Sequence, residues 1–144
     1  MTNLTTLILV AGKSSRFKSN KSKIFHELGG IPIIDHVFNN AKKISKNNIV
    51  FVCNKSNINI LKKRFKNCKF SLQKKQNGTA NAVLTAKKLI RKNSSILILF
   101  GDVPLITLVS LRKLIHNFAK NKLSGAILAF NAKKPFGYGR LIIQ

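Results

Sequence analysis

Apolar residues follow two alternating patterns along this chain, short continuous runs and longer stretches with a period of three or four residues. The runs predict five buried strands, at residues 4–10, 49–53, 70–72, 96–100 and 126–130. The periodic stretches predict helices that begin near residues 33, 58, 80 and 108. Strands alternating with helices favour βαβ units and a mostly parallel sheet covered on both faces. We therefore predict a Rossmann-like α/β sandwich of three layers, in which residues 4–10 and 96–100 are adjacent, central parallel strands.

The length of 144 residues fits one domain, and no Pro- or Gly-rich linker or internal repeat divides it. A last apolar run, residues 141–143, ends one position before the end of the sequence. A strand there would have no helix to cover it. We therefore expect a sheet that is truncated at its C-terminal side, either because the chain is a fragment or because its edge is unprotected.

The charge balance is extreme, with 27 Lys plus Arg against three Asp plus Glu and a formal net charge of +24. Nucleic-acid binding is one interpretation of this excess. Compositional drift is the other, because the excess is mostly Lys and is spread along the chain. The Phe residues lie within apolar runs rather than between Arg residues, so no single-strand-binding platform is indicated. In either case such a surface attracts phosphorylated small molecules.

Several classes of protein are excluded by what the chain lacks. Its longest apolar runs are far below the roughly 20 residues of a membrane helix, and no secretory signal pattern is visible, so we expect a cytoplasmic protein without a membrane partner. Cys53 and Cys68 indicate neither a disulfide framework nor a zinc site. Neither a Ser-His-Asp triad nor a pair of carboxylates can be assembled from the three acids, and the three histidines have no ligand spacing.

Ligands of such sheets bind at the carboxyl ends of the strands, so the segments after each strand are the candidate site. The first strand is followed by AGKSSR at residues 11–16. Its small residues allow the backbone to approach a phosphate, and Lys13 and Arg16 add positive charge. The spacing is neither that of a P-loop nor G-x-G-x-x-G. The alternative is an ordinary polar loop.

A single carboxylate is expected at the same edge. The acids are Glu27, Asp35 and Asp102, and only Asp102, after residues 96–100, follows a strand directly. Such a carboxylate can hold Mg²⁺ when the phosphates of a substrate complete the coordination shell. The alternative is a solvated turn residue before a proline.

The third predicted strand leads into QKKQNGTA at residues 73–80. Gly78 and Thr79 predict the start of a helix with free backbone donors. The amides of Gln73 and Gln76 can pair with the donor and acceptor edge of a base. The alternative is a polar loop followed by a capped helix.

Five segments in one order resemble the uridyltransferase domain of bacterial N-acetylglucosamine-1-phosphate uridyltransferases, within the MobA-like and sugar-phosphate nucleotidyltransferases. They are LVAGKSSRF (9–17), KIFH with the following LGG-PII-HV (23–37), QKKQNGTA (73–80), GDVPLI (101–106) and GYGR (137–140). The first is shared across the superfamily, including guanylyltransferases, and the other four favour the sugar-phosphate members. Ser14, Phe17, Ser22 and Phe100 stand where that family has Gly, Met, Pro and Tyr.

The resemblance implies a role for each matched residue. The nucleotide would be bound by Leu9, Val10, Ala11, Gly12, Lys23, Gln73, Gly78, Thr79, Phe100, Gly101 and Asp102, with Gln73 facing the uracil. Arg16 and Lys23 would act on the triphosphate as the catalytic cations, Asp102 would bind Mg²⁺, and Gly139 would approach the sugar.

The resemblance also implies a reaction and a domain arrangement. A sugar-1-phosphate would attack UTP to give UDP-N-acetylglucosamine, a cell-wall precursor, and pyrophosphate. Residues 1–144 would be the N-terminal, nucleotide-binding part of the nucleotidyltransferase domain, without the family's acetyltransferase β-helix. Two alternatives stay open, an inactive nucleotide-binding remnant and a guanylyl- or cytidylyltransferase.

Overall fold

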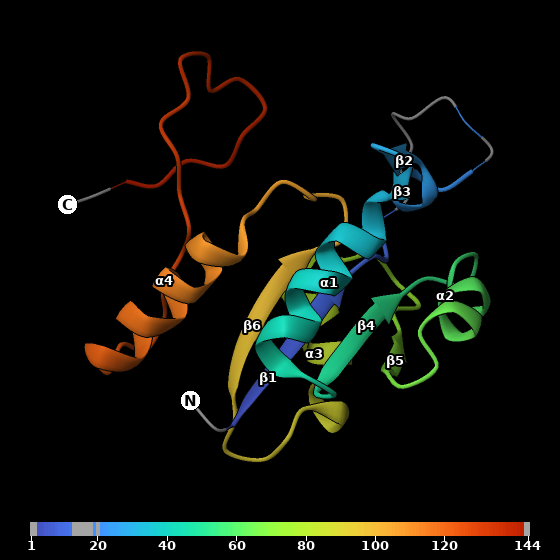
Figure 1. Cartoon of the computed structure of the whole chain (residues 1–144), viewed down its shortest axis with the longest axis horizontal. Coiled ribbons are helices and arrows are strands. Elements are labelled where there is room, and N and C mark those ends of the chain that lie inside the picture. Colours follow the sequence, from blue (N-terminus) through green and yellow to red (C-terminus); the bar gives the residue numbers. More distant parts are fainter. Residues whose placement is uncertain (1–2, 13–18, 20, 143–144) are drawn as a thin grey trace.

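The computed structural model describes residues 3–12, 19 and 21–142. Its centre is a sheet of four parallel strands in the order β5-β4-β1-β6 (Figure 1). The strands are β1 (Leu4–Leu9), β4 (Ile49–Cys53), β5 (Lys69–Leu72) and β6 (Ser95–Phe100). Four of the five predicted strands are therefore confirmed to within one residue at each end. The predicted parallel pairing of the first and fourth is confirmed too, with Leu4 opposite Ser95 and Leu9 opposite Phe100.

The helices begin close to where the apolar periodicity predicts them. They are α1 (Ile33–Ser45), α2 (Ile58–Arg64), α3 (Gly78–Thr85) and α4 (Leu108–Lys120). The periodic stretch that begins near residue 80 does not continue as one helix, because α3 ends at Thr85 and a 3₁₀ turn, η2 (Lys87–Leu89), follows. Between β1 and α1 lie a 3₁₀ turn, η1 (Lys23–Phe25), and a small antiparallel hairpin of β2 (Glu27–Leu28) and β3 (Ile31–Pro32). No helix in the described part of the chain is long and apolar enough to cross a membrane.

Helices cover both faces of the sheet, with α1 in front and α3 behind it in Figure 1. On the α1 face, Phe51 of β4 stacks on Phe65 at 4.9 Å and on Phe70 at 5.5 Å between ring centroids. On the other face, Ala82 of α3 and Ala86 directly after it lie against apolar residues of β1 and β4. Since β4 is buried on both sides, its sequence is a continuous apolar run, and β1 departs from that pattern only at the buried Thr5 and Thr6. The three predicted layers are confirmed.

The predicted fifth strand, residues 126–130, is wrong. No strand occurs there, and Ile127 and Phe130 are 69% and 70% exposed. The chain beyond α4 runs away from the sheet (Figure 1), so no neighbouring strand is available to pair with this apolar run. Residues 141–142 form no strand either, and Ile143 lies outside the described residues.

The missing fifth strand changes the position of β6. It pairs with β1 alone and forms an edge of the described sheet rather than a central strand. Ile96, Ile98 and Phe100 on one face of it are 43%, 41% and 47% exposed. Leu97 and Leu99 on its other face are buried in the α1-side core. β6 is therefore held by the packing of one face against the core and by its hydrogen bonds to β1.

The ends of β1 and β6 are joined at Gly101. Its amide donates a hydrogen bond of 2.9 Å to the carbonyl of Leu9. A Cβ atom at this position would lie 2.3 Å from Cγ1 of Val10, well inside contact distance. Only a residue without a side chain therefore allows the two strand ends to approach this closely.

We predict that Gly101→Ala lowers the free energy of unfolding by about 1–3 kcal/mol, the cost of overpacking a tight contact. Urea unfolding followed by circular dichroism measures the effect. Gly125→Ala is the matched control, because a Cβ there meets no atom within 4 Å. Equal urea midpoints for the two variants would show that the contact at Gly101 is not constrained.

Candidate active site

A cavity of about 420 Å³ opens at the carboxyl ends of β1, β5 and β6. Its lining residues are Leu9, Val10, Ala11, Gly12, Ser22, Lys23, Ile24, Gln73, Gln76, Gly78, Thr79, Ala82, Phe100 and Asp102. The structure thus brings together the nucleotide-binding residues proposed from the sequence, with Gly101 held between two of them. The segments that meet here are separated by up to about 90 residues of chain, and the parallel sheet alone places them at one edge.

The chain leaving β1 has its carbonyl groups occupied by side-chain amides from neighbouring segments. Nδ2 of Asn57 donates to the carbonyl of Val10 at 2.7 Å. Nε2 of Gln76 donates to the carbonyl of Ala11 at 2.7 Å, and Nδ2 of Asn54 reaches the same oxygen at 3.3 Å. The amides of Ala11 and Gly12 have no acceptor among the described residues. This edge therefore offers donors rather than acceptors, as an anion requires.

Asn54 and Asn57 are functional neighbours of the site that the sequence analysis missed. Asn57 is 1% exposed, and its Oδ1 accepts from the amide of Asn54 at 3.1 Å. Oδ1 of Asn54 in turn accepts from the amide of Asn57 at 3.0 Å. Their position shortly after the second predicted strand could have identified them, because it places them at the same sheet edge as the other candidates.

The beginning of α3 supplies a second set of main-chain donors. Gly78 has a φ of +85°, a conformation that favours glycine, and it opens the helix. Asn77 before it makes no side-chain capping hydrogen bond, so the first turn keeps its amides available. Gly78 and Thr79 both line the cavity. The predicted helix start with free backbone donors is confirmed.

Lys23 and Asp102 are the charged residues of the cavity among the described positions. Nζ of Lys23 lies 3.1 Å from Oδ2 of Asp102, and the side chains are 39% and 44% exposed. An exposed pair of this kind is weakly held, so both groups can take other partners.

The side chains at this edge fit one particular way of holding Mg²⁺. Within the described residues no three His, Cys, Asp or Glu side chains gather into a metal cluster. A Mg²⁺ ion here would therefore have Asp102 as a single carboxylate ligand, with phosphate oxygens and water as the others, which is how Mg²⁺ commonly binds with nucleotides.

The described lining of the cavity leaves the roles of two predicted site residues untested. Arg16, with Lys13, lies outside the described residues. Gly139 lies on the exposed segment after α4 and is absent from the cavity lining. Their proposed roles stay predictions.

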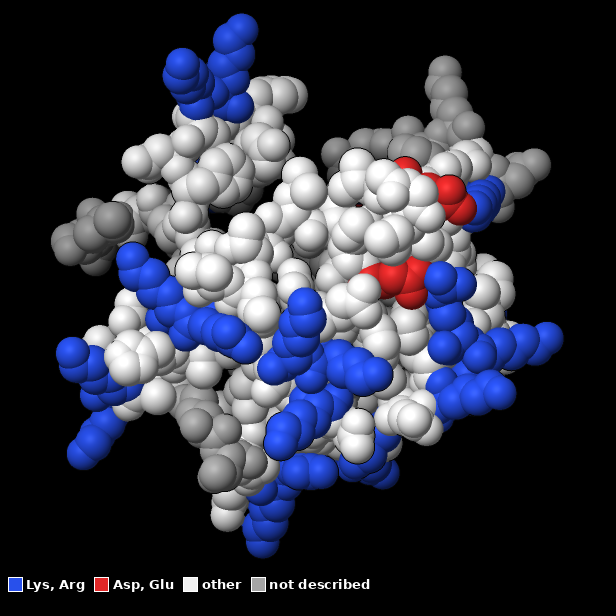
Figure 2. Space-filling model, in the orientation of Figure 1, with Lys and Arg blue, Asp and Glu red and all other residues white. Residues whose placement is uncertain are grey.

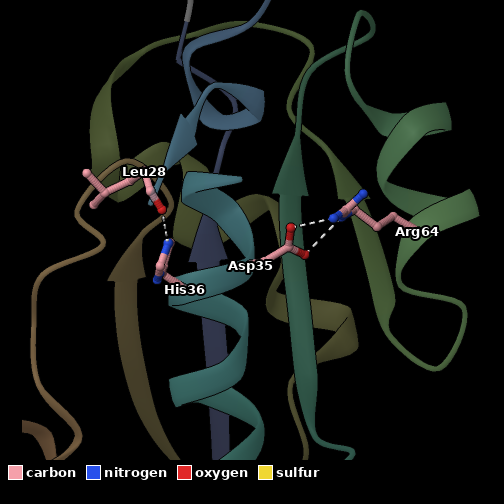
Figure 3. A network of polar contacts seen from close by, with 4 residues as sticks. All are labelled: Leu28, Asp35, His36 and Arg64. Carbon is pink, nitrogen blue, oxygen red and sulfur yellow. Dashed lines mark hydrogen bonds and ion pairs between the residues drawn. The ribbon is translucent and has the colours of Figure 1, made fainter. Parts of the chain in front are cut away.

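Several other ionisable groups are held in structural contacts or are buried. Asp35 of α1 accepts from Nε of Arg64 at 2.8 Å, which ties α1 to the end of α2 and raises the pKa of Arg64 (Figure 3). The ring of His36 lies 2.9 Å from the carbonyl of Leu28 in the hairpin (Figure 3). Burial raises the pKa of Cys53 to about 12 and that of Cys68 to about 11, so neither thiol is a ready nucleophile.

The positive charge is distributed rather than concentrated. Figure 2 shows Lys and Arg side chains spread around the visible face, with the acidic side chains gathered in one area. The charge therefore supplies a general attraction for anions.

A parallel sheet whose carboxyl edge offers main-chain donors, a lysine and one carboxylate defines a Rossmann-like nucleotide-binding class of domain. This chain belongs to the MobA-like NTP transferase domain family, which it matches over residues 6–143.

Relatives and solved structures agree with that membership. The chain is 39% identical over 137 residues to the bifunctional protein GlmU of Buchnera aphidicola subsp. Acyrthosiphon pisum (strain Tuc7). The aligned region covers 94% of this chain and 29% of that relative. It is 35% identical over 137 residues to GlmU of Staphylococcus haemolyticus (strain JCSC1435), covering 94% of the chain and 30% of the relative. The chain thus spans less than a third of the length of these relatives.

Two solved structures share the fold. A putative glucose-1-phosphate thymidylyltransferase from Bacillus anthracis aligns with a TM-score of 0.69 at 19% identity, over 83% of this chain and 51% of that one. The bifunctional IspDF from Campylobacter jejuni aligns with a TM-score of 0.67 at 26% identity, over 82% of this chain and 31% of that one.

We predict that Asn57→Ala lowers the free energy of unfolding by about 1–3 kcal/mol, because the carbonyl of Val10 loses its donor while it stays buried. Urea unfolding measures the change. Asn117→Ala, at an exposed position of α4, removes the same atoms where they make no contact and should leave the midpoint unchanged. A small effect at Asn57, equal to that at Asn117, would mean that the amide does not hold the strand end.

Proposed function

We propose that the cavity binds UTP with Mg²⁺ and that this chain is the nucleotide-binding part of a nucleotidyltransferase domain acting on a sugar-1-phosphate. The observation that carries the proposal is the set of available main-chain donors at residues 11–12 and at the start of α3, which face one cavity together with Lys23 and Asp102. A triphosphate has the anionic oxygens that such donors bind. The resemblance to uridyltransferases supplies the choice of UTP, of N-acetylglucosamine-1-phosphate as the acceptor and of UDP-N-acetylglucosamine as the product.

The proposed reaction needs no nucleophile from the protein. An oxygen of the sugar-1-phosphate attacks the α-phosphorus of UTP, a new P–O bond forms, and the bond to the β-phosphate breaks. Pyrophosphate leaves with the electron pair of that bond. Positioning and charge stabilisation supply nearly all of the catalysis in such transfers. The lack of a paired Ser, Cys or carboxylate in the cavity is therefore compatible with the chemistry.

The residues of this chain would act by binding and by neutralising charge. The amides at residues 11–12 and Lys23 would hold the phosphates as negative charge moves onto the leaving pyrophosphate. Arg16 would add a second cation from the loop after β1. Asp102 would hold Mg²⁺, which lowers the repulsion between the two anionic reactants.

Binding without transfer is a second candidate, and a specific observation favours it. Every described residue that lines the cavity comes from residues 9–102, while the segment that carries Gly139 lies apart from it. The described residues therefore form the cavity proposed for the nucleotide, and Gly139, the residue proposed to approach the sugar, does not line it.

Asp102→Asn is expected to abolish the Mg²⁺ dependence of UTP binding, because the amide keeps the shape of the side chain and loses its charge. Calorimetry of UTP binding with and without Mg²⁺ measures this. Any uridylyl transfer should fall by orders of magnitude, since a bound metal contributes several kcal/mol to such a transition state. Residual binding to the variant should weaken steeply with salt, as screened charge does.

Glu27→Gln is the matched control, because Glu27 is an exposed acid outside the cavity and its loss changes the net charge equally. It should bind UTP with the Mg²⁺ dependence of the unaltered chain. If Asp102→Asn behaves as Glu27→Gln does, Asp102 is a turn residue and the proposed metal ligand is wrong.

A further inference from the structure

The side-chain amide of Gln73 is held in one place by the first turn of α3. Gln73 follows β5, its backbone amide donates to the carbonyl of Cys53 at 2.8 Å, and the residue is 5% exposed. Its Nε2 donates to Oδ1 of Asn81 at 3.1 Å and lies 3.4 Å from the carbonyl oxygen of Gly78. Both hydrogens of this amide are therefore directed into α3 and away from a ligand.

The orientation of the two amides follows from the chemistry of their partners. A backbone carbonyl only accepts hydrogen bonds, so the nitrogen end of the Gln73 amide must face Gly78. Asn81 must then turn its oxygen, and not its nitrogen, toward Gln73. Asn81 thus accepts the shorter of the two hydrogen bonds and, together with the carbonyl of Gly78, holds the Gln73 amide in this orientation.

The oxygen of the Gln73 amide is left for the cavity. Oε1 accepts no hydrogen bond from any residue that the structure describes. It is also not sealed from solvent, because the buried side-chain atom without a partner in the described part is Oδ1 of Asn48. Since Gln73 lines the cavity, a bound base meets an acceptor at this position.

We propose that Asn81 is a positioning residue that fixes Gln73 as a hydrogen-bond acceptor and so selects the base of the nucleotide. An acceptor pairs with the ring N–H that uracil, thymine and guanine carry, whereas cytosine and adenine carry an acceptor at that ring position. Two facing acceptors leave both unpaired, which is the repulsive element that specificity requires. This inference rests on the proposed nucleotide site and adds the reason for its base preference.

The experiment compares UTP and CTP, each with Mg²⁺, on the full chain and on two variants of Asn81. Calorimetry should show that the unaltered chain binds UTP about tenfold more tightly than CTP, the value of one hydrogen bond. Asn81→Leu removes the shorter of the two hydrogen bonds at similar volume and leaves the Gln73 amide held only by the 3.4 Å contact with the carbonyl of Gly78. The UTP-to-CTP preference should therefore fall. Asn81→Asp keeps an oxygen that accepts the same hydrogen bond and should keep the preference.

Inorganic tripolyphosphate is the control ligand, because it uses the phosphate donors and never meets Gln73. Its affinity should be equal for the unaltered chain and Asn81→Leu. Asn81→Asp adds a negative charge and should bind tripolyphosphate more weakly, so only its UTP-to-CTP ratio is compared. If Asn81→Leu also weakens tripolyphosphate binding, that substitution has distorted the site, and the result for Asn81→Asp decides between the outcomes. Loss of the UTP-to-CTP preference in Asn81→Asp would then contradict the inference.

Two further outcomes separate the inference from the proposed function. A UTP-to-CTP ratio that Asn81→Leu leaves unchanged, or a preference of the unaltered chain for CTP, overturns the role of Asn81 and leaves the nucleotide site standing. Absence of binding by UTP, CTP and tripolyphosphate to the unaltered chain overturns both.

Discussion

The close parallel pairing of β1 with β6 is the constraint on which the site depends. Gly101 hydrogen-bonds to Leu9 where a side chain would collide with Val10, and this contact sets the two strand ends level. Asp102 then follows β6 at the same edge at which residues 10–12 follow β1. Lys23, from the connection after β1, reaches Asp102 across this edge. A carboxylate and a cation far apart in the sequence thus meet beside free main-chain donors.

The polarity of that edge comes from neutral amides rather than from the large positive charge. Asn57, Asn54 and Gln76 occupy the carbonyl oxygens of the chain leaving β1, which leaves N–H groups for a ligand. Gln73 is oriented in the opposite sense, with its hydrogens consumed and its oxygen free. The same kind of side chain thus leaves donors free in one part of the cavity and an acceptor free in another, which suit the phosphates and the base of the proposed nucleotide. The spread of Lys and Arg over the surface adds attraction without this selectivity.

The sequence predicts most of the buried strands of this structure, but it does not predict where the sheet ends. Strands β1 and β4 were predictable because burial on both faces makes them largely apolar runs. The run at residues 126–130 is also apolar and forms no strand, because an apolar run indicates burial but does not provide a neighbour to pair with. The position of β6 at the sheet edge was missed for the same reason.

The site was predictable to the level of which residues approach one another. Strand ends and their polar residues are visible in the sequence, so Asp102, Gln73 and the loop at residues 11–12 could be proposed. The direction in which an amide points is set by partners such as Asn81 and Gly78, and these contacts exist only after folding. The roles of Arg16 and Gly139 still rest on the resemblance alone.

Chemical-shift mapping separates a built nucleotide site from general attraction between a triphosphate and a basic surface. Two-dimensional ¹⁵N–¹H spectra of the chain would be recorded during titration with UTP and Mg²⁺ at moderate salt. The amides of Ala11, Gly12, Gly78 and Thr79 should shift together and saturate at one stoichiometric equivalent, while those of α4 stay in place. Shifts spread over the lysine-rich helices, without saturation and lost as salt is raised, would contradict a nucleotide site at the end of β1.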